Sequence, residues 1–184
     1  MERKRCQWAD PASELYTAYH DQEWGVPEHD DQKLFEMLIL EGFQAGLSWI
    51  TILKKRDAFR KAFDNFNPSV IAQYSPEKLA ELMANPGIVR NRRKIVAAVT
   101  NAAVFLEIQQ EFGSFDRYLW GFTDGQVILN TDDQVRASSK LSDRISADLK
   151  RRGMKFVGTV IIYSFLQAVG VVNDHETCCW RYPR

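Results

Sequence analysis

The chain has 184 residues, of which 45% are hydrophobic and 26% are charged, so it is long enough to bury one substantial core and short for two. No apolar run reaches the ~18 residues of a membrane span, and the charged N-terminus is not followed by the apolar stretch of a secretory signal. We therefore expect a soluble, cytoplasmic monomer that folds as a single domain over residues 1–184.

Lysine plus arginine and aspartate plus glutamate balance at 24 each. The overall charge therefore gives no indication of nucleic-acid binding, and any contact with DNA would need local patches. Two short basic clusters, residues 90–94 and 150–155, are candidates for such patches. Clusters of this length are also typical of solvated helix ends, so both interpretations stay open.

The first strong helical pattern begins at about residue 31, with Asp30 or Asp31 as the expected cap. Its apolar face also carries Glu41, so a carboxylate stands where an apolar side chain is expected. Glycines bracket a predicted break over residues 42–46, and a second helix is expected over residues 48–56, with further helical turns directly after it.

A helix over residues 75–83, a Pro-Gly turn and a long helix over residues 92–112 follow in that order. This order is typical of a helix-hairpin-helix DNA-binding element, in which exposed backbone N–H groups hold a phosphate and basic side chains add charge. An ordinary helical hairpin is the alternative. The candidate DNA contacts are Gly87, Arg90, Arg92, Arg93 and Lys94.

The remaining segments also favour helices. Residues 113–131 combine a short helix with a polar stretch, and helices are expected over residues 142–151 and 159–168. The last of these is so apolar that it should lie at the centre of the molecule, and Gly170 is a plausible stop. The fold class predicted from these patterns is all-α.

Histidine and cysteine gather near the two chain ends. Three cysteines do not make a complete disulfide framework, whereas Cys6 and His20 together with His175 and Cys179 have the composition of a structural Cys2His2 zinc site. Four protein ligands would leave no open position for a reactive water, so the expected zinc is structural. A buried reduced cysteine with surface histidines is the alternative, and the neighbouring thiol of Cys178 could also ligate.

Aromatic side chains crowd the N-terminal arm, which has few aliphatic residues: Trp8, Tyr16, Tyr19 and Trp24. Such clusters are often packing residues. They are also what a pocket for a flipped base needs, because aromatic faces stack on the base and polar groups read its edge. For a cationic base, a buried carboxylate such as that of Glu41 would add opposite charge and a hydrogen-bond acceptor.

Residues 19–27, 40–49, 155–168 and 172–175 together resemble the 3-methyladenine DNA glycosylase I family, and the likeness spans nearly the whole chain. The resemblance implies an all-helical, helix-hairpin-helix glycosylase fold with a structural zinc that joins the N- and C-terminal segments. It also implies release of 3-methyladenine from alkylated double-stranded DNA, which leaves an abasic site.

Residue by residue, the resemblance implies that Glu41 contacts the adenine edge, that Tyr19 and Trp49 enclose the base, and that the Cys2His2 set binds zinc. It assigns further residues to the pocket or its surroundings: Trp8, Tyr16, Trp24, Tyr163 and Ser164. The family is described as lacking the catalytic aspartate of its relatives. Lys94, in a basic run that suggests phosphate contact, is not expected to act as a lyase nucleophile.

Two other classes of function compete with this interpretation. A zinc-dependent hydrolase of small molecules would need an open metal position. A non-catalytic DNA-binding module would use Glu41 and the aromatic residues only for packing. A carboxylate on a buried face beside an aromatic cluster favours the enzyme.

Overall fold

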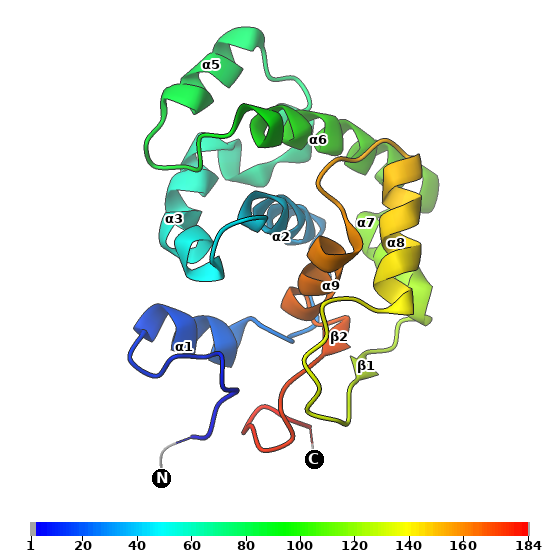
Figure 1. Ribbon diagram of the computed structural model, residues 1–184. Helices are drawn as coiled ribbons and strands as arrows, with labels where there is room; N and C mark the ends of the chain where they lie inside the picture. Colours follow the sequence, from blue (N-terminus) through cyan, green and yellow to red (C-terminus); the bar gives the residue numbers. More distant parts are fainter. Residues whose placement is uncertain (1–2, 184) are drawn as a thin grey trace.

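The computed structural model describes residues 3–183, and helices dominate it (Figure 1). The α-helices are α1 (Glu14–Gln22), α2 (Asp31–Gln44), α3 (Trp49–Ala62), α4 (Pro68–Ile71), α5 (Pro76–Ala84), α6 (Arg92–Phe112), α7 (Phe115–Trp120), α8 (Lys140–Arg151) and α9 (Thr159–Ala168). Short 3-10 helices, η1 (Asp64–Phe66) and η2 (Gly121–Thr123), and two short strands, β1 (Ile128–Leu129) and β2 (Val172–Asn173), complete the described part. No helix within residues 3–183 is long and apolar enough to cross a membrane.

Helix α2 lies at the centre and packs against α3, α6, α7 and α9. It begins after Asp30, whose carboxylate accepts a hydrogen bond from the Lys33 backbone N–H at 2.9 Å, as one of the two expected caps. The predicted break over residues 42–46 is too early, because the helix continues to Gln44. Gly42 lies inside the helix, where a Cβ would come within 3.5 Å of Phe156.

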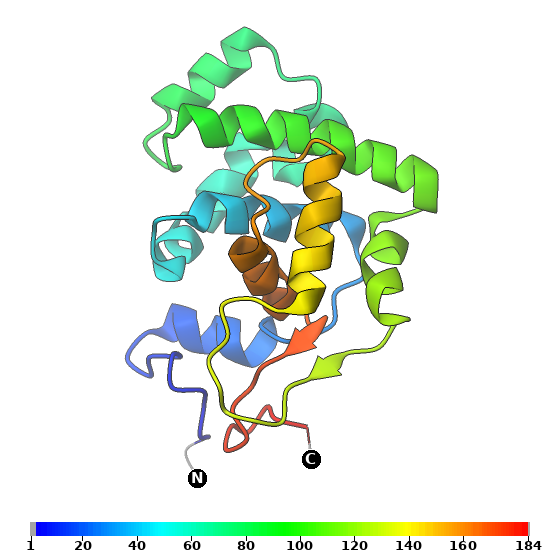
Figure 2. The ribbon, with the colours of Figure 1, turned by 45° about the vertical axis from the view of Figure 1, so that its right-hand side comes forward.

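The apolar patterns of the later helices predicted their places well. Ser75 caps α5, and the long helix α6 covers residues 92–112, as expected. Figure 2 shows α6 crossing the molecule with α5 on its outer side. Helix α9 is central, as predicted, and packs against α2 and α8 with buried apolar side chains.

The all-α prediction needs a correction, because the fold is mostly helical and contains a parallel strand pair. Ile128 pairs with Val172 and Leu129 pairs with Asn173. Strands of two residues carry no periodic pattern in the sequence, so this pairing depends on tertiary contacts. It holds the segment before α8 against the C-terminal segment, close to where the two chain ends meet (Figures 1 and 2).

Candidate active site and metal centre

Four thiol and imidazole groups from the two ends of the chain meet in a buried cluster. The ligand atoms of Cys6, His20, His175 and Cys179 all lie within 4.8 Å of one another. The Cys6 Sγ is 3.4 Å from the His175 Nδ1, and the Cys179 Sγ is 3.4 Å from the His20 Nε2. Tetrahedral zinc bound by sulfur and nitrogen separates neighbouring ligand atoms by about 3.6 Å. The donor set therefore fits a metal ion.

The outer contacts of this cluster orient both rings. The His20 Nδ1 lies 2.8 Å from the Asp21 carboxylate, and the His175 Nε2 lies 3.2 Å from the Trp24 carbonyl oxygen. The other nitrogen of each ring is thus directed at the thiols, as in protein metal sites. Burial lowers the pKa of His20, and it lowers the pKa of His175 to about 4, so both rings are neutral and able to ligate.

Cys178 lies outside this cluster. It is exposed, whereas Cys179 is buried among the other ligand atoms. The backbone N–H groups of Glu176 and Arg181 point at the thiols of Cys6 and Cys179, each at 3.4 Å. The sequence left the choice between the two neighbouring thiols open, and the fold decides for Cys179.

A cavity of about 320 Å³ lies next to this Cys2His2 cluster, and its volume falls at the lower end of the range for small-molecule sites. Trp8 packs on the His20 ring and Trp24 on the His175 ring, with centroid separations of 5.4 and 4.7 Å, so the Cys2His2 cluster supports one wall. The lining residues are Trp8, Tyr16, Tyr19, Trp24, Glu41, Gln44, Trp49, Val135, Arg136, Ser164 and Gln167.

Glu41 is the chemically unusual member of this lining. Its side chain is 4% exposed and makes no hydrogen bond with any residue in the described part of the chain. Burial raises the pKa of Glu41 to about 8. The Trp49 indole N–H is also buried without a hydrogen-bond acceptor within residues 3–183. Buried polar groups normally have partners, so these two groups are available to a ligand.

Two tyrosines complete the aromatic wall. Tyr19 is buried, with its ring centroid 5.5 Å from that of Trp49, and burial together with the nearby Glu41 carboxylate raises the pKa of Tyr19 well above its ordinary value. Its hydroxyl therefore stays neutral. The Tyr16 hydroxyl accepts a hydrogen bond from the Ile50 backbone N–H at 3.2 Å, which ties α1 to the start of α3.

The structure separates two residues that the sequence assigned to the pocket or its surroundings. Ser164 lines the cavity, but Tyr163 does not: it is 2% exposed and its hydroxyl donates to the Asp174 carboxylate at 2.6 Å. Neighbouring residues on a helix face different directions, so Ser164 and Tyr163 cannot share the cavity wall equally.

Sequence reasoning also missed three polar lining residues, Gln44, Arg136 and Gln167. Helical spacing could have found two of them, because Gln44 follows Glu41 by three residues and Gln167 follows Ser164 by three. Arg136 lies in an irregular segment that no periodic pattern describes.

The turn between α5 and α6 differs in part from expectation. Arg90, Arg92 and Arg93 are exposed and have no ion pair within residues 3–183, as a phosphate contact requires. The Gly87 N–H, in contrast, donates to the Asn85 side chain at 2.8 Å and is not free to hold a phosphate. In this turn, the backbone N–H groups of residues 88–90 have no hydrogen-bond partner within residues 3–183.

Lys94 is a second correction, because it is buried and cannot reach a phosphate. Its side chain is 7% exposed, and its Nζ donates to the carbonyl oxygens of Phe43 at 2.8 Å and Ala45 at 2.6 Å. These carbonyls lie at the C-terminal end of α2, where a helix leaves acceptors unpaired and attracts positive charge. Lys94 therefore fixes the end of the helix that carries Glu41.

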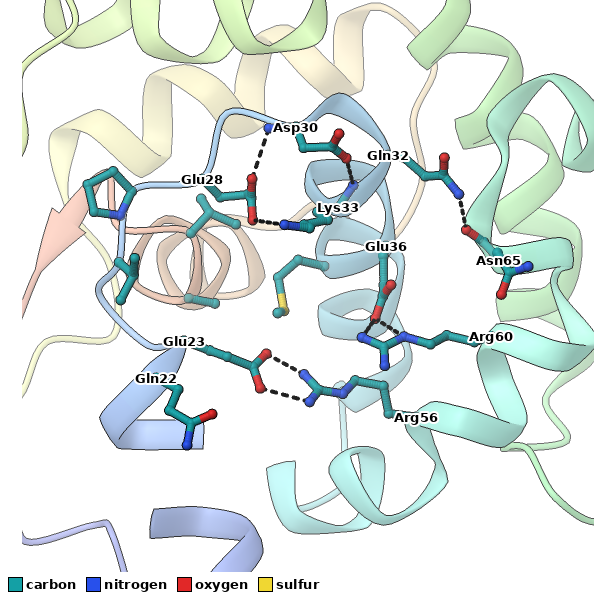
Figure 3. A pocket seen from close by; sticks show the side chains of 15 residues that line it. Gln22, Glu23, Glu28, Asp30, Gln32, Lys33, Glu36, Arg56, Arg60 and Asn65 are labelled. Carbon is teal, nitrogen blue, oxygen red and sulfur yellow. Dashed lines mark hydrogen bonds and ion pairs between the residues drawn. The ribbon is translucent and has the colours of Figure 1, made fainter. Parts of the chain in front are cut away.

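A second cavity, of about 820 Å³, lies between α1, α2 and α3 (Figure 3). Each of its basic side chains is paired with a carboxylate, and the Asp30 carboxylate caps α2. Arg56 binds Glu23 through two hydrogen bonds, Arg60 binds Glu36, and Lys33 lies 3.4 Å from Glu28. Because its charges are already neutralised, this cavity offers less to a ligand than the smaller one.

The fold and the smaller cavity define a mostly helical protein able to enclose a flat ring beside a buried carboxyl group. The chain belongs to the methyladenine glycosylase family, whose model matches residues 8–182. It is 48% identical to DNA-3-methyladenine glycosylase 1 of Escherichia coli (strain K12), over 98% of this chain and 97% of that relative. The resemblance seen in the sequence is thus confirmed.

Solved structures agree. A crystal structure of 3-methyladenine DNA glycosylase I matches with a TM-score of 0.94 and 49% identity, over 98% of this chain and 100% of that one. The 3-methyladenine DNA glycosylase I of Staphylococcus aureus, whose structure concerns the recognition of 3-methyladenine, matches with a TM-score of 0.93 and 37% identity, over 98% of this chain and 97% of that one.

Proposed function

We propose that this chain is a DNA-3-methyladenine glycosylase that hydrolyses the N-glycosidic bond of 3-methyladenine in alkylated double-stranded DNA and leaves an abasic site. The observation that carries this proposal is the unpaired, buried carboxyl group of Glu41 inside an aromatic cavity. Methylation at N3 makes adenine cationic. A cationic, flat base matches aromatic faces and a carboxylate better than an ordinary base does.

In the proposed complex, Tyr19, Trp49 and the tryptophans of the cavity wall stack on or around the flipped base. Glu41 accepts a hydrogen bond from the adenine edge, and in its ionised form it offsets the charge of the base. The aromatic residues that line the cavity with them are Trp8, Tyr16 and Trp24, and Ser164 contributes a hydroxyl from α9.

The chemical step needs little help from an acid, because a cationic purine is already a good leaving group. The C–N bond loosens, its electron pair goes to the base, and water adds to the sugar carbon and loses a proton. The cavity lining within residues 3–183 contains no lysine, and the Lys94 amine is held by two carbonyl groups. We therefore propose hydrolysis without a lyase step.

We also propose that Cys6, His20, His175 and Cys179 hold a structural zinc ion. When bound, zinc would cross-link the N- and C-terminal segments. Such a cross-link would hold both segments on the core, because chain ends otherwise fray. The cross-link would also hold His20 and His175, on which Trp8 and Trp24 of the cavity wall pack.

DNA would be held by a helix-hairpin-helix element made of α5, α6 and the turn between them. The unpaired backbone N–H groups of residues 88–90 and the side chains of Arg90, Arg92 and Arg93 would contact phosphates. We propose that the whole chain, residues 1–184, acts as one domain and as a monomer in the cytoplasm.

The proposal is tested by excision. Purified protein is incubated with duplex DNA treated with N-methyl-nitrosourea, and the released bases are identified by chromatography. We expect release of 3-methyladenine with little 7-methylguanine. No released base from folded, metal-loaded protein would contradict the proposed activity and favour a non-catalytic DNA-binding module.

A further inference from the structure

Gln167 of α9 lines the base cavity, and its amide is held in one orientation. The Nε2 donates to the Asp174 carboxylate at 2.6 Å, while Asp174 itself does not line the cavity. A carboxylate only accepts hydrogen bonds, so the NH2 end of the amide must face Asp174 and the Oε1 end must face away from it. The hydrogen bond to Asp174 therefore fixes the orientation of the Gln167 amide.

Asp174 is held in turn by two other groups. The Tyr163 hydroxyl donates to its Oδ2 at 2.6 Å, and the Asn130 amide donates to its Oδ1. Asn130 also donates to the Tyr163 hydroxyl at 3.2 Å. These hydrogen bonds and the burial of Tyr163 leave the Asp174 carboxylate little freedom to turn. The Gln167 amide that is bonded to it is restricted in the same way.

The Gln167 Oε1 has no hydrogen-bond partner within the described residues. Because Gln167 lines the cavity and Asp174 does not, the Oε1 is the end of the amide that is left to a ligand there. Adenine carries two N–H donors on its 6-amino group, whereas guanine carries an acceptor oxygen at the same position. An acceptor that faces this position matches the first base and opposes the second.

We propose that Gln167 is a specificity-determining residue that accepts a hydrogen bond from the 6-amino group of the purine and rejects 6-oxo purines. The inference rests on the proposed function, because it assumes that the cavity receives a methylated purine. A 6-oxo purine would place its oxygen against the Gln167 Oε1 and leave both acceptors unpaired in a buried site. A site built to hydrogen-bond one group discriminates strongly against an analogue that lacks it.

The test compares two variants in which a glutamine side chain is replaced by methionine. Gln167→Met keeps the length of the side chain and removes the acceptor. Gln109→Met is the matched control, because the Gln109 Nε2 also donates to a carboxylate at 2.6 Å, that of Asp31, and Gln109 does not line the cavity. The measurement is the ratio of 3-methyladenine to 3-methylguanine released from the same methylated DNA, together with the affinity of each free base.

We expect Gln167→Met to lower the 3-methyladenine to 3-methylguanine ratio on the order of tenfold, because one buried hydrogen bond and one acceptor clash disappear. Gln109→Met should leave the ratio at its wild-type value. An equal fall in both activities, or an unchanged ratio in Gln167→Met, would overturn the inference.

The free-base affinities separate this inference from the proposed function. If the wild-type protein binds 3-methyladenine but releases none from DNA, the proposed activity is wrong. The preference for 3-methyladenine over 3-methylguanine in binding, and its loss in Gln167→Met, would still decide the role of Gln167.

Discussion

The carboxylates of the two cavities differ in whether they have a hydrogen-bond partner. In the larger cavity, of about 820 Å³, each basic side chain binds a carboxylate, as Arg60 binds Glu36 and Arg56 binds Glu23 (Figure 3). In the smaller cavity, of about 320 Å³, Glu41 has no hydrogen-bond partner within residues 3–183 and the Trp49 indole N–H has none either.

This difference, and not the size of the two cavities, supports the proposed role of the smaller one. A buried polar group without a partner destabilises the free protein, and a ligand that pairs it recovers that free energy on binding. Paired groups bring no such gain. The Cys2His2 cluster resembles the larger cavity, because the outer nitrogens of both histidines have partners. Trp8 and Trp24 of the smaller cavity pack on these histidine rings.

The largest expected effect comes from removing a residue of the Cys2His2 cluster, which supports the wall of the smaller cavity. Cys179→Ser should cost several kcal/mol of folding free energy and lower the melting temperature on the order of 10 °C, because a buried metal ligand is lost. The matched control is Cys178→Ser at an exposed thiol, which should change neither. The folded fraction of Cys179→Ser should keep its excision rate per molecule. A stable but inactive protein would show that the metal takes part in catalysis.

Glu41→Gln tests the unpaired group directly. We expect excision and binding of free 3-methyladenine to fall about 10- to 100-fold, because a charge-assisted hydrogen bond becomes a neutral one. The variant should be at least as stable as the wild type, because it removes a buried group that can ionise. Glu36→Gln, on the same helix but in the larger cavity, is the control and should leave excision unchanged. Equal effects of the two variants would break the comparison between the cavities.

Lys94 and Arg93 are adjacent in sequence but should differ in effect. Lys94→Met leaves the Phe43 and Ala45 carbonyls unpaired, so we expect a loss of about 2 kcal/mol in stability with an unchanged salt dependence of DNA binding. Arg93→Met should leave stability unchanged and reduce the salt slope of DNA binding by about one. A reduced salt slope with unchanged stability in Lys94→Met would show that Lys94 contacts a phosphate.

The pH dependence sharpens the role of Glu41. Its pKa rises from 4.5 to about 8 on burial, so the unfolded chain loses this proton first as the pH rises. The stability that Glu41 contributes is therefore present at low pH and declines between about pH 5 and pH 8. Relative to the wild type, Glu41→Gln should gain stability across this window.

Excision should show the opposite trend in the same window. Because a cationic base favours the ionised carboxylate, the wild-type rate should rise toward pH 8, and Glu41→Gln should lack this rise. Melting curves and single-turnover excision rates at each pH measure both quantities. Parallel pH profiles of the two proteins would contradict the assignment of Glu41.

The smallest effect is expected in the larger cavity. Arg60→Met breaks a partly exposed ion pair with Glu36, in which the arginine side chain is 39% exposed. Such pairs contribute about 1 kcal/mol or less, so stability should change little and excision not at all. A large loss of excision in Arg60→Met would mean that the larger cavity takes part in the function.

Much of this protein was predictable from local patterns. The helices that begin after Asp30, Ser75 and Asn91 have caps and apolar spacing that act over a few residues. The Cys2His2 composition and the carboxylate at Glu41 on an apolar face were also visible in the sequence. These signals are local, or depend only on residue type, so they can be recognised without knowledge of the fold.

Tertiary structure decided the rest. Lys94 belongs to a basic run in sequence, yet its amine donates to the Phe43 carbonyl at the end of α2. Tyr163 precedes Ser164, but its hydroxyl donates to Asp174. The orientation of the Gln167 amide depends on Asp174, which only the chain beyond α9 brings to it. Direction, partner and orientation are set by groups distant along the chain, because a hydrogen bond depends on where atoms meet in space and not on residue type alone.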